Sequence, residues 1–227
     1  ATKLGLQGIP ISAELLIIER DLTLLEYNNC RYHIAQISSA NSVDIIRERK
    51  NKVNFSCGVS INNLSLNEND IGDFKTFLKL SPPLRTETDR NALVQGLNDE
   101  TIDVIVSDHK PEDEENKRLT FAQAETGASG IETLLPLSLE LYHNGSVELE
   151  TIIKALTSKP AEILKINKGN LSTGNDADFC IVDINKPWVV RKEKLISKSK
   201  NTPIEDKKLQ GKVISTFVNG EELFKSE

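Results

Sequence analysis

The pattern of apolar and polar positions divides the chain into two parts, with the change after Asn167. In the first part, apolar residues recur either at helical spacing or in short β-branched runs, and the two patterns alternate. The stretches that predict helices are 12–26, 40–51, 86–97, 130–143 and 147–157, followed by a short helix with Pro160 at its first position. The stretches that predict strands are 31–37, 53–60, 75–80 and 101–107.

Polar residues and prolines support several of these boundaries. The expected N-caps, which share a side-chain oxygen able to accept a backbone N–H, are Ser12, Ser38 or Ser39, and Thr86 in a capping box with Asp89. The pair Pro82-Pro83 ends the third expected strand because proline cannot donate to a β-ladder.

After Asn167, glycines separate short β-rich runs. These runs cover 178–184, 187–190 and 212–218. A series of strands that follows a strand–helix alternation predicts a second, β-rich unit. We therefore expect an α/β domain over 1–166 and a β-rich tail over 167–227.

The alternation in residues 1–166 predicts parallel strands joined by crossover helices. An open doubly wound sheet and a TIM (β/α)8 barrel both satisfy this pattern. A barrel needs eight units and about 250 residues, so under that interpretation these residues form about half of one. The sequence also contains no Met, even at its first position. This favours a piece of a longer protein, or a sequence from which Met has been left out.

The amino-acid composition argues against several classes of function. The net charge of -6 disfavours nucleic acid as a partner, because phosphate binding needs clustered Lys and Arg. No apolar run approaches the roughly 18–20 residues that span a bilayer. The thiols of Cys30, Cys57 and Cys180 are odd in number and form no CxxC motif, which is typical of reduced cysteines in a cytoplasmic protein.

Chemistry-bearing side chains gather at the expected strand ends, where sites form in parallel α/β folds. They are His33, Gln36, Asn62, Asn63, Ser81, Asp108 and His109. Asp108 directly follows the run VIVS, so its carboxylate is expected at the mouth of the sheet, although an N-cap or turn role is also compatible with this position. The charged segment 110–118 is expected to be a solvated surface loop, and His143 to lie at a helix C-terminus.

Several stretches together resemble dihydroorotases of the long, two-domain type in the amidohydrolase superfamily. In the first part they are GIPISAELLIIERDL (8–22), FLKLSPPLRTETDR (77–90), TIDVIVSDHKPEDEENKR (101–118) and GASGIETLLPLSLEL (127–141). Further along the chain they are KPAEIL (159–164), LSTGNDADFCIVD (171–183), SKSKNTPI (197–204) and LQGKVISTFVNGEELF (209–224). The resemblance covers the whole chain in register. It implies the C-terminal half of a TIM barrel followed by a small β-rich domain.

The same resemblance implies a chemistry. Dihydroorotases interconvert dihydroorotate and N-carbamoyl-aspartate in pyrimidine biosynthesis, with zinc supplying hydroxide and polarising the carbonyl. Asp108 matches the family's proton-shuttling, metal-binding aspartate. Ser81 stands at a substrate-contacting Asn position, Gly127 falls in a loop whose backbone faces the substrate, and Glu112 replaces a substrate-contacting His. The resemblance also implies a cytoplasmic homo-oligomer.

The metal-ligand positions depart from the family pattern. Gln36 stands where the strand pattern His-x-x-His ends in a metal-binding His, and Asn62-Asn63 replaces a His pair. Amides are poor substitutes for imidazole at zinc, which prefers nitrogen and sulfur donors. Two hypotheses follow. The chain is part of a cyclic amide hydrolase that is inactive by itself, or it is a non-catalytic, dihydroorotase-like scaffold that binds aspartate transcarbamoylase.

Overall fold

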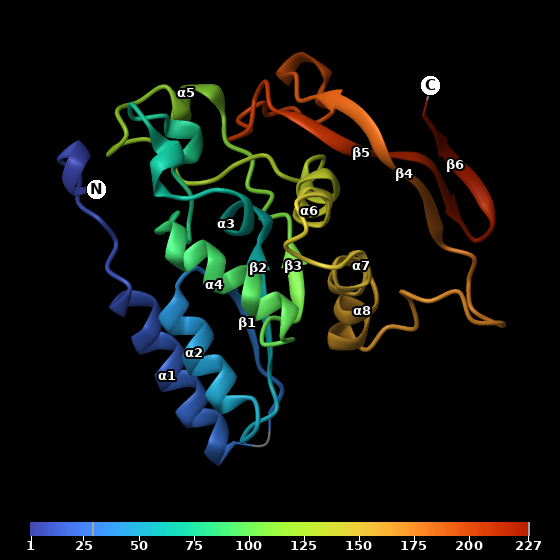
Figure 1. Cartoon of the computed structure of the whole chain (residues 1–227), viewed down its shortest axis with the longest axis horizontal. Helices are drawn as coiled ribbons and strands as arrows, with labels where there is room; N and C mark the ends of the chain where they lie inside the picture. The colour runs from blue at the N-terminus through green and yellow to red at the C-terminus, as the bar shows by residue number, and fades with distance from the viewer. Residues whose placement is uncertain (29, 227) are drawn as a thin grey trace.

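A parallel sheet runs through the first part of the molecule (Figure 1). The computed structural model describes residues 1–28 and 30–226. Within them the parallel sheet comprises β1 (His33–Ile37), β2 (Ser56–Ser60) and β3 (Val104–Val106), in the order β1-β2-β3. These strands confirm three of the four that the sequence predicts, with shorter bounds. β2 is buried along almost its whole length, as expected for a strand covered on both faces.

Helices lie on both sides of these strands. In Figure 1, α1, α2 and α4 lie on one side and α6, α7 and α8 on the other. The helical elements of the first part are α1 (Ser12–Tyr27), α2 (Ala40–Arg49), α3 (Ile61–Ser65), α4 (Glu87–Asn98), α5 (Glu114–Lys117), α6 (Leu134–His143), α7 (Leu149–Leu156) and α8 (Ser158–Leu164). Short 3-10 turns occupy Thr2–Leu4, Glu68–Ile71, Thr76–Leu78 and, in the tail, Lys192–Lys194.

Two of the expected helix starts are confirmed. Ser39 caps α2 by accepting the N–H of Ser42, and Thr86 and Asp89 form a reciprocal capping box at the start of α4. Each of these caps satisfies N–H groups that the first helical turn leaves without a partner.

The other two expected helix starts are wrong. Ser12 is the first residue of α1 rather than its cap, a position held by Ile11. Pro160 is the third residue of α8, which begins at Ser158. Proline is tolerated there because N–H groups in the first turn have no partner within the helix.

The strand predicted at 75–80 is wrong. This stretch forms a 3-10 turn at Thr76–Leu78 and then an irregular segment. Leu78 and Leu80 are buried, so their alternation reflects a segment packed on the core rather than a strand paired in a sheet. The expected fourth strand–helix alternation is accordingly absent from the described residues.

The tail forms an antiparallel sheet of β4 (Phe179–Val189), β5 (Lys208–Val218) and β6 (Glu221–Lys225). The predicted runs 178–184 and 187–190 belong to one strand, and 212–218 lies within β5. β6 was not predicted, although Asn219-Gly220, both with positive φ, is a typical hairpin turn. The sheet contacts α6 closely at Gly211, where an added Cβ would lie 2.3 Å from a methyl carbon of Leu139.

Candidate functional site

Three polar side chains meet at the carboxyl ends of the parallel strands. Gln36 lies near the end of β1, Ser60 ends β2, and Asp108 follows β3 after one intervening residue. The Gln36 amide Nε2 donates to Asp108 Oδ1 at 2.9 Å, and the Ser60 hydroxyl also hydrogen-bonds the Asp108 side chain. Gln36 and Asp108 come together because parallel strands bring their carboxyl ends to one edge of the sheet.

The environment of Asp108 disfavours its charged form. The half-buried position raises the pKa of Asp108 above its ordinary value, and the hydrogen bond from Gln36, the positive charge of Lys110 and the hydroxyl of Ser60 act in the opposite direction. Its backbone also adopts φ of 48°, a left-handed conformation that Asp tolerates better than most residues. A carboxyl group held this way is suited to exchange a proton near a bound ligand.

Asn62 and Asn63 lie in the first turn of α3, directly after β2, as expected. Both are buried, and Ser60 caps the helix by accepting the N–H of Asn62. Asn63 donates its amide to the carbonyl of Pro83 at 3.0 Å. Within the described residues, neither amide atom of Asn62 has a hydrogen-bond partner, which is unusual for a fully buried polar group.

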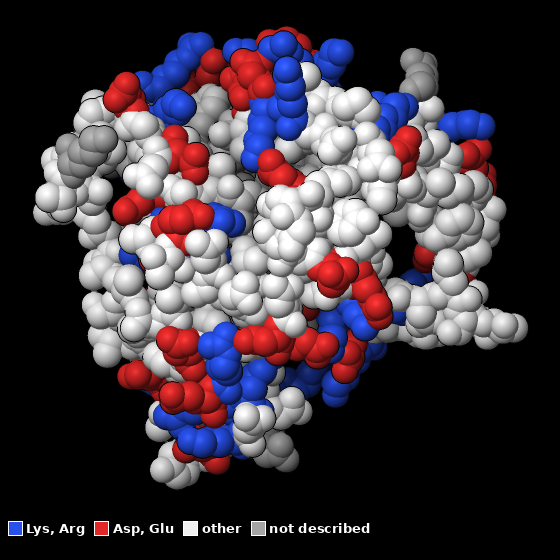
Figure 2. Space-filling model, viewed as in Figure 1, with Lys and Arg blue, Asp and Glu red and all other residues white. Residues whose placement is uncertain are grey.

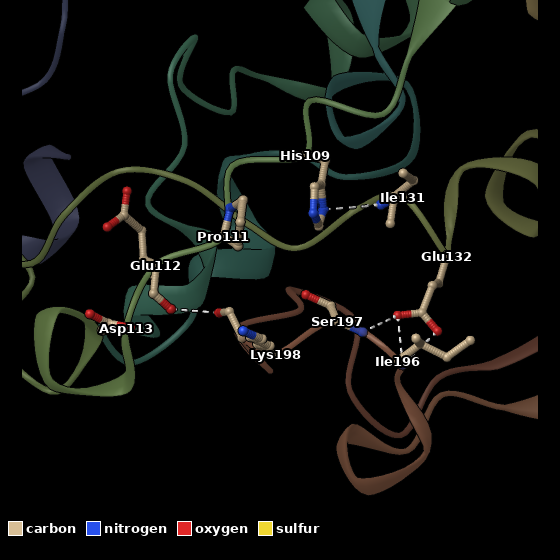
Figure 3. Close-up of a pocket in the computed structure, with 10 residues that line it drawn as sticks. His109, Pro111, Glu112, Asp113, Ile131, Glu132, Ile196, Ser197 and Lys198 are labelled. Atoms are coloured by element: carbon tan, nitrogen blue, oxygen red, sulfur yellow. Dashed lines mark hydrogen bonds between the residues drawn. The ribbon is translucent and has the colours of Figure 1, made fainter.

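His109 braces the loop that follows β3. Its Nδ1 accepts the N–H of Gly130 at 3.2 Å and that of Ile131 at 3.4 Å, the latter drawn in Figure 3. Because Nδ1 acts as an acceptor, the neutral ring carries its proton on Nε2. The next residue, Lys110, donates its N–H to Ala128 at 2.8 Å, so the two loops run side by side.

Gly127 packs against this loop. An added Cβ would lie 2.6 Å from the carbonyl oxygen of Lys110, and φ is 137°, so the position requires glycine. Its N–H donates to the carbonyl of Lys79 at 3.0 Å, and its carbonyl accepts from Asn201 Nδ2 at 3.1 Å. Both backbone groups of Gly127 therefore have partners within the protein.

Glu112 lines a cavity of about 730 Å³ together with His109 and with residues 131–132 and 196–199 (Figure 3). Its backbone N–H is held by Asn201 Oδ1 at 3.3 Å. Ser81 lies in an exposed turn, where it precedes a cis peptide bond to Pro82.

Segment 110–118 is mostly exposed, as predicted, but it is neither solvated at every residue nor entirely a loop. It contains α5, and Lys117 is only 1% exposed. The Lys117 ammonium donates to the carbonyls of Thr76, Lys79 and Glu125, at 3.1, 3.4 and 2.6 Å. Burial lowers the pKa of Lys117 to about 8. The number of charged residues in the segment does not show that one lysine is buried, because burial leaves the sequence composition unchanged.

Asn201 is the residue of this region that the sequence interpretation did not single out. It is buried and contacts both the Glu112 and the Gly127 loops. The signal for it was the block SKSKNTPI, which matches the family pattern but was assigned no role.

The remaining histidines lie elsewhere. His33 is the first residue of β1, where its ring bonds the Ser56 hydroxyl at 2.7 Å. His143 ends α6, as expected, and bonds the carbonyl of Ile184 at 2.9 Å. Across residues 1–28 and 30–226, no group of three or more His, Cys, Asp or Glu side chains could hold a metal ion.

The face of the molecule that Figure 2 shows carries charges of both signs. In Figure 2, acidic and basic side chains are interspersed over the visible face. Over the part of the chain that the structure describes, no helix has the length and hydrophobicity needed to cross a membrane.

Comparison with known proteins identifies the family to which the chain belongs. The model of the amidohydrolase family matches residues 10–223. The chain belongs to the amidohydrolase family. Within the family it is of the dihydroorotase type. It is 43% identical over 220 residues to a dihydroorotase of Ehrlichia canis, covering 96% of this chain and 49% of that protein.

A dihydroorotase of Geotalea daltonii is 40% identical over 228 residues, covering 100% of this chain and 54% of that protein. This amidohydrolase chain thus spans about half the length of the curated relatives it matches.

Solved structures share the fold. An L-hydantoinase (dihydropyrimidinase) from Arthrobacter aurescens superposes with a TM-score of 0.89 at 28% identity, covering 95% of this chain and 49% of the other. A dihydropyrimidinase from Brevibacillus agri NCHU1002 has a TM-score of 0.88 at 23% identity and the same coverage, and supports the fold alone. The α/β prediction and the family resemblance are confirmed.

Proposed function

We propose that residues 1–166 are the C-terminal half of a (β/α)8 barrel and that 167–227 contribute to a small β-rich domain. Three parallel strands with helices on both sides support this assignment. The relatives, about twice as long, have room for the other strands of such a barrel.

The full-length protein, in this proposal, descends from cytoplasmic enzymes that convert dihydroorotate to N-carbamoyl-aspartate. The dihydroorotase relatives support this substrate class, a cyclic amide that carries a carboxylate. They also motivate a divalent metal, with zinc as the specific expectation, and a homo-oligomer. Asp108 is then the proton-transfer residue, and Ser81, Glu112 and Gly127 belong to the substrate-facing loops.

The residues of this chain do not fit a zinc centre. The expected histidine positions are Gln36, Asn62 and Asn63, and no metal-binding cluster occurs in the described part of the chain. One observation carries the conclusion: Gln36 directs an amide N–H at Asp108, so a donor occupies the carboxylate oxygen at 2.9 Å. We infer that the full-length protein keeps this aspartate but lacks a complete zinc centre and does not hydrolyse dihydroorotate.

Metal content and turnover of the purified full-length protein test this conclusion. After incubation with zinc and gel filtration, we expect less than one bound zinc per chain and no hydrolysis of dihydroorotate. Asp108→Ala and Asp108→Asn are then as inactive as the parent. One zinc per chain, together with turnover that Asp108→Ala abolishes, would overturn the conclusion.

A second candidate function is a non-catalytic scaffold for aspartate transcarbamoylase. The observation that favours it is that the expected metal-binding positions, Gln36 and Asn62-Asn63, carry amides while the fold and the Asp108 loop are retained. It predicts co-purification of the two proteins and loss of transcarbamoylase activity or assembly when this protein is removed. Unchanged transcarbamoylase in its absence contradicts this candidate.

A further inference from the structure

A segment far along the chain closes over the loops that carry Glu112 and Gly127. This segment, residues 195–202, lies between β4 and β5 and is called the strap here. Its residue Asn201 is 2% exposed. The Asn201 Nδ2 donates to the Gly127 carbonyl at 3.1 Å, while its Oδ1 accepts the Glu112 N–H at 3.3 Å. One amide group therefore joins both loops.

This pair of hydrogen bonds requires a side-chain amide, because its nitrogen donates while its oxygen accepts. Asn201 Oδ1 also accepts the hydroxyl of Ser129 at 2.9 Å, and the Asn201 carbonyl accepts the Ser129 N–H at 3.2 Å. Ser199 completes the contact by donating to the Glu112 carbonyl at 2.5 Å. The Glu112 loop is thus bonded to the strap through its backbone, and the 127–129 loop through its backbone and the Ser129 side chain.

The strap is itself held in place. The carboxylate of Glu132, two residues before α6, accepts the N–H groups of Ile196 and Ser197 at 2.9 to 3.0 Å (Figure 3). Lys200 Nζ donates across the strap to the Ser197 carbonyl at 2.6 Å. Because the strap is held by Lys200 from within and by Glu132 from outside, it can impose a conformation on the loops it touches.

We propose that Asn201 is a positioning residue for the substrate-facing loops, and that the C-terminal tail thereby sets the shape of the candidate site. This inference rests on the proposed function, because those loops face a substrate only if the site binds a cyclic amide. Asn201 touches no ligand in this assignment. It orients the Gly127 carbonyl and the Glu112 N–H, and through Glu112 one wall of the cavity.

Two substitutions at Asn201 test separately the hydrogen bond that its side chain donates and the one that it accepts. Asn201→Ala removes both, so amide exchange with deuterium at residue 112 and across 127–129 is expected to become about tenfold faster. Asn201→Asp keeps an acceptor for the Glu112 N–H but places an oxygen against the Gly127 carbonyl. It is expected to keep residue 112 at the parent rate and to accelerate exchange only across 127–129.

Thr202→Val is the matched control. Thr202 is as buried as Asn201, lies in the same strap, and its hydroxyl has no partner within the described residues. Its replacement by an isosteric apolar side chain is expected to leave exchange in both loops unchanged. The dissociation constant for dihydroorotate, used as the probe, should rise about tenfold in Asn201→Ala and stay constant in Thr202→Val.

The outcomes distinguish the two proposals. Parent-like exchange in Asn201→Ala, or equal acceleration of both loops in Asn201→Asp, overturns the positioning role. If Asn201→Ala does not fold, the split between loops in Asn201→Asp still decides the question. If the parent protein fails to bind dihydroorotate, the proposed substrate is wrong, while the exchange pattern continues to test Asn201.

Discussion

The two sheets of this molecule differ in how they are buried. β2, in the parallel sheet, has every residue after Ser56 buried, whereas β6, in the antiparallel sheet, has every residue exposed. The difference follows from the helices, which lie on both sides of the parallel strands, whereas the tail sheet packs on α6 through β5. The chemistry-bearing strand ends sit on the buried sheet, where neighbouring side chains limit their movement.

The tail depends on the first part for its burial. Gly211 of β5 packs on Leu139 of α6, and Lys207 forms an ion pair with Glu140 at 2.7 Å. The first part depends on the tail in turn, because the strap holds the loops that follow β3. A mutation in the parallel sheet should therefore weaken the whole molecule, and one on the outer face of the tail should not.

The largest expected effect tests this contrast with a matched pair of isoleucines. Ile37 in β1 is fully buried, whereas Ile181 in β4 is 50% exposed. Ile37→Ala removes core contacts and leaves a cavity, so it is expected to lower the free energy of unfolding by about 3 kcal/mol. Ile181→Ala is expected to cost less than about 1 kcal/mol. Urea unfolding measures both, and equal losses would contradict the contrast.

The next effect concerns Lys117, which ties three loop carbonyls together. Lys117→Met keeps the length of the side chain but leaves these carbonyls without the ammonium, and is expected to cost about 2 kcal/mol at pH 7. The carbonyls belong to Thr76, Lys79 and Glu125. Urea unfolding at fixed pH provides the measurement, and an unchanged midpoint would show that the bonds add no stability.

The same lysine should make stability depend on pH. Its pKa is about 8 in the folded protein, below the ordinary value of 10.5, so the unfolded chain binds more protons between these values. Stability of the parent relative to Lys117→Met should therefore rise with pH across this window, by at most about 1.4 kcal/mol per pH unit. A gap that stays constant from pH 7 to 10 would contradict the lowered pKa.

The smallest effect compares the two aspartates that flank β3. Asp103 accepts the Cys57 N–H and the Lys50 ammonium, both at 2.7 Å, so Asp103→Asn is expected to cost about 1–2 kcal/mol. The raised pKa of Asp108 means that the fold disfavours its negative charge, so the same substitution should not cost stability there. Asp108→Asn is expected to be neutral or stabilising by less than about 1 kcal/mol at pH 7.

The sign of the Asp108 effect can be checked by pH. Because the folded state binds the proton of Asp108 more tightly than the unfolded chain, the ionised group costs stability above its folded pKa. The advantage of Asp108→Asn should therefore disappear as pH falls below about 3.8, where both states are protonated. A variant that is less stable than the parent at pH 7 would instead assign Asp108 a structural role.

Local patterns predicted most of the scaffold. The caps at Ser39 and Thr86 were found because a capping interaction involves residues only three positions apart. The stretch 75–80 was misassigned because alternating Leu78 and Leu80 look the same in a strand and in an irregular segment packed on the core. Periodicity reports which side chains are buried, but not what the backbone pairs with.

The candidate site was predictable in its members but not in its contacts. Asp108 was expected at the mouth of the sheet because it follows an Ile- and Val-rich run, but its hydrogen bond with Gln36 was not predicted. Lys117 was assigned to a solvated loop, and Asn201 received no role. Both side chains bond groups that lie far away along the sequence, so the pattern within a short segment cannot predict these contacts.

The sequence by itself determined the α/β order of elements, the family, and the substitution of amides at positions where relatives of this type are expected to carry histidine. These properties depend on residue identity and on spacing over a few turns of helix or strand. The tertiary structure alone decided that Gln36 bonds Asp108 across 72 residues of chain, and that Asn201 joins Glu112 to Gly127. The physical reason is that a hydrogen bond depends on distance and direction in space, which chain folding sets through burial of the whole core.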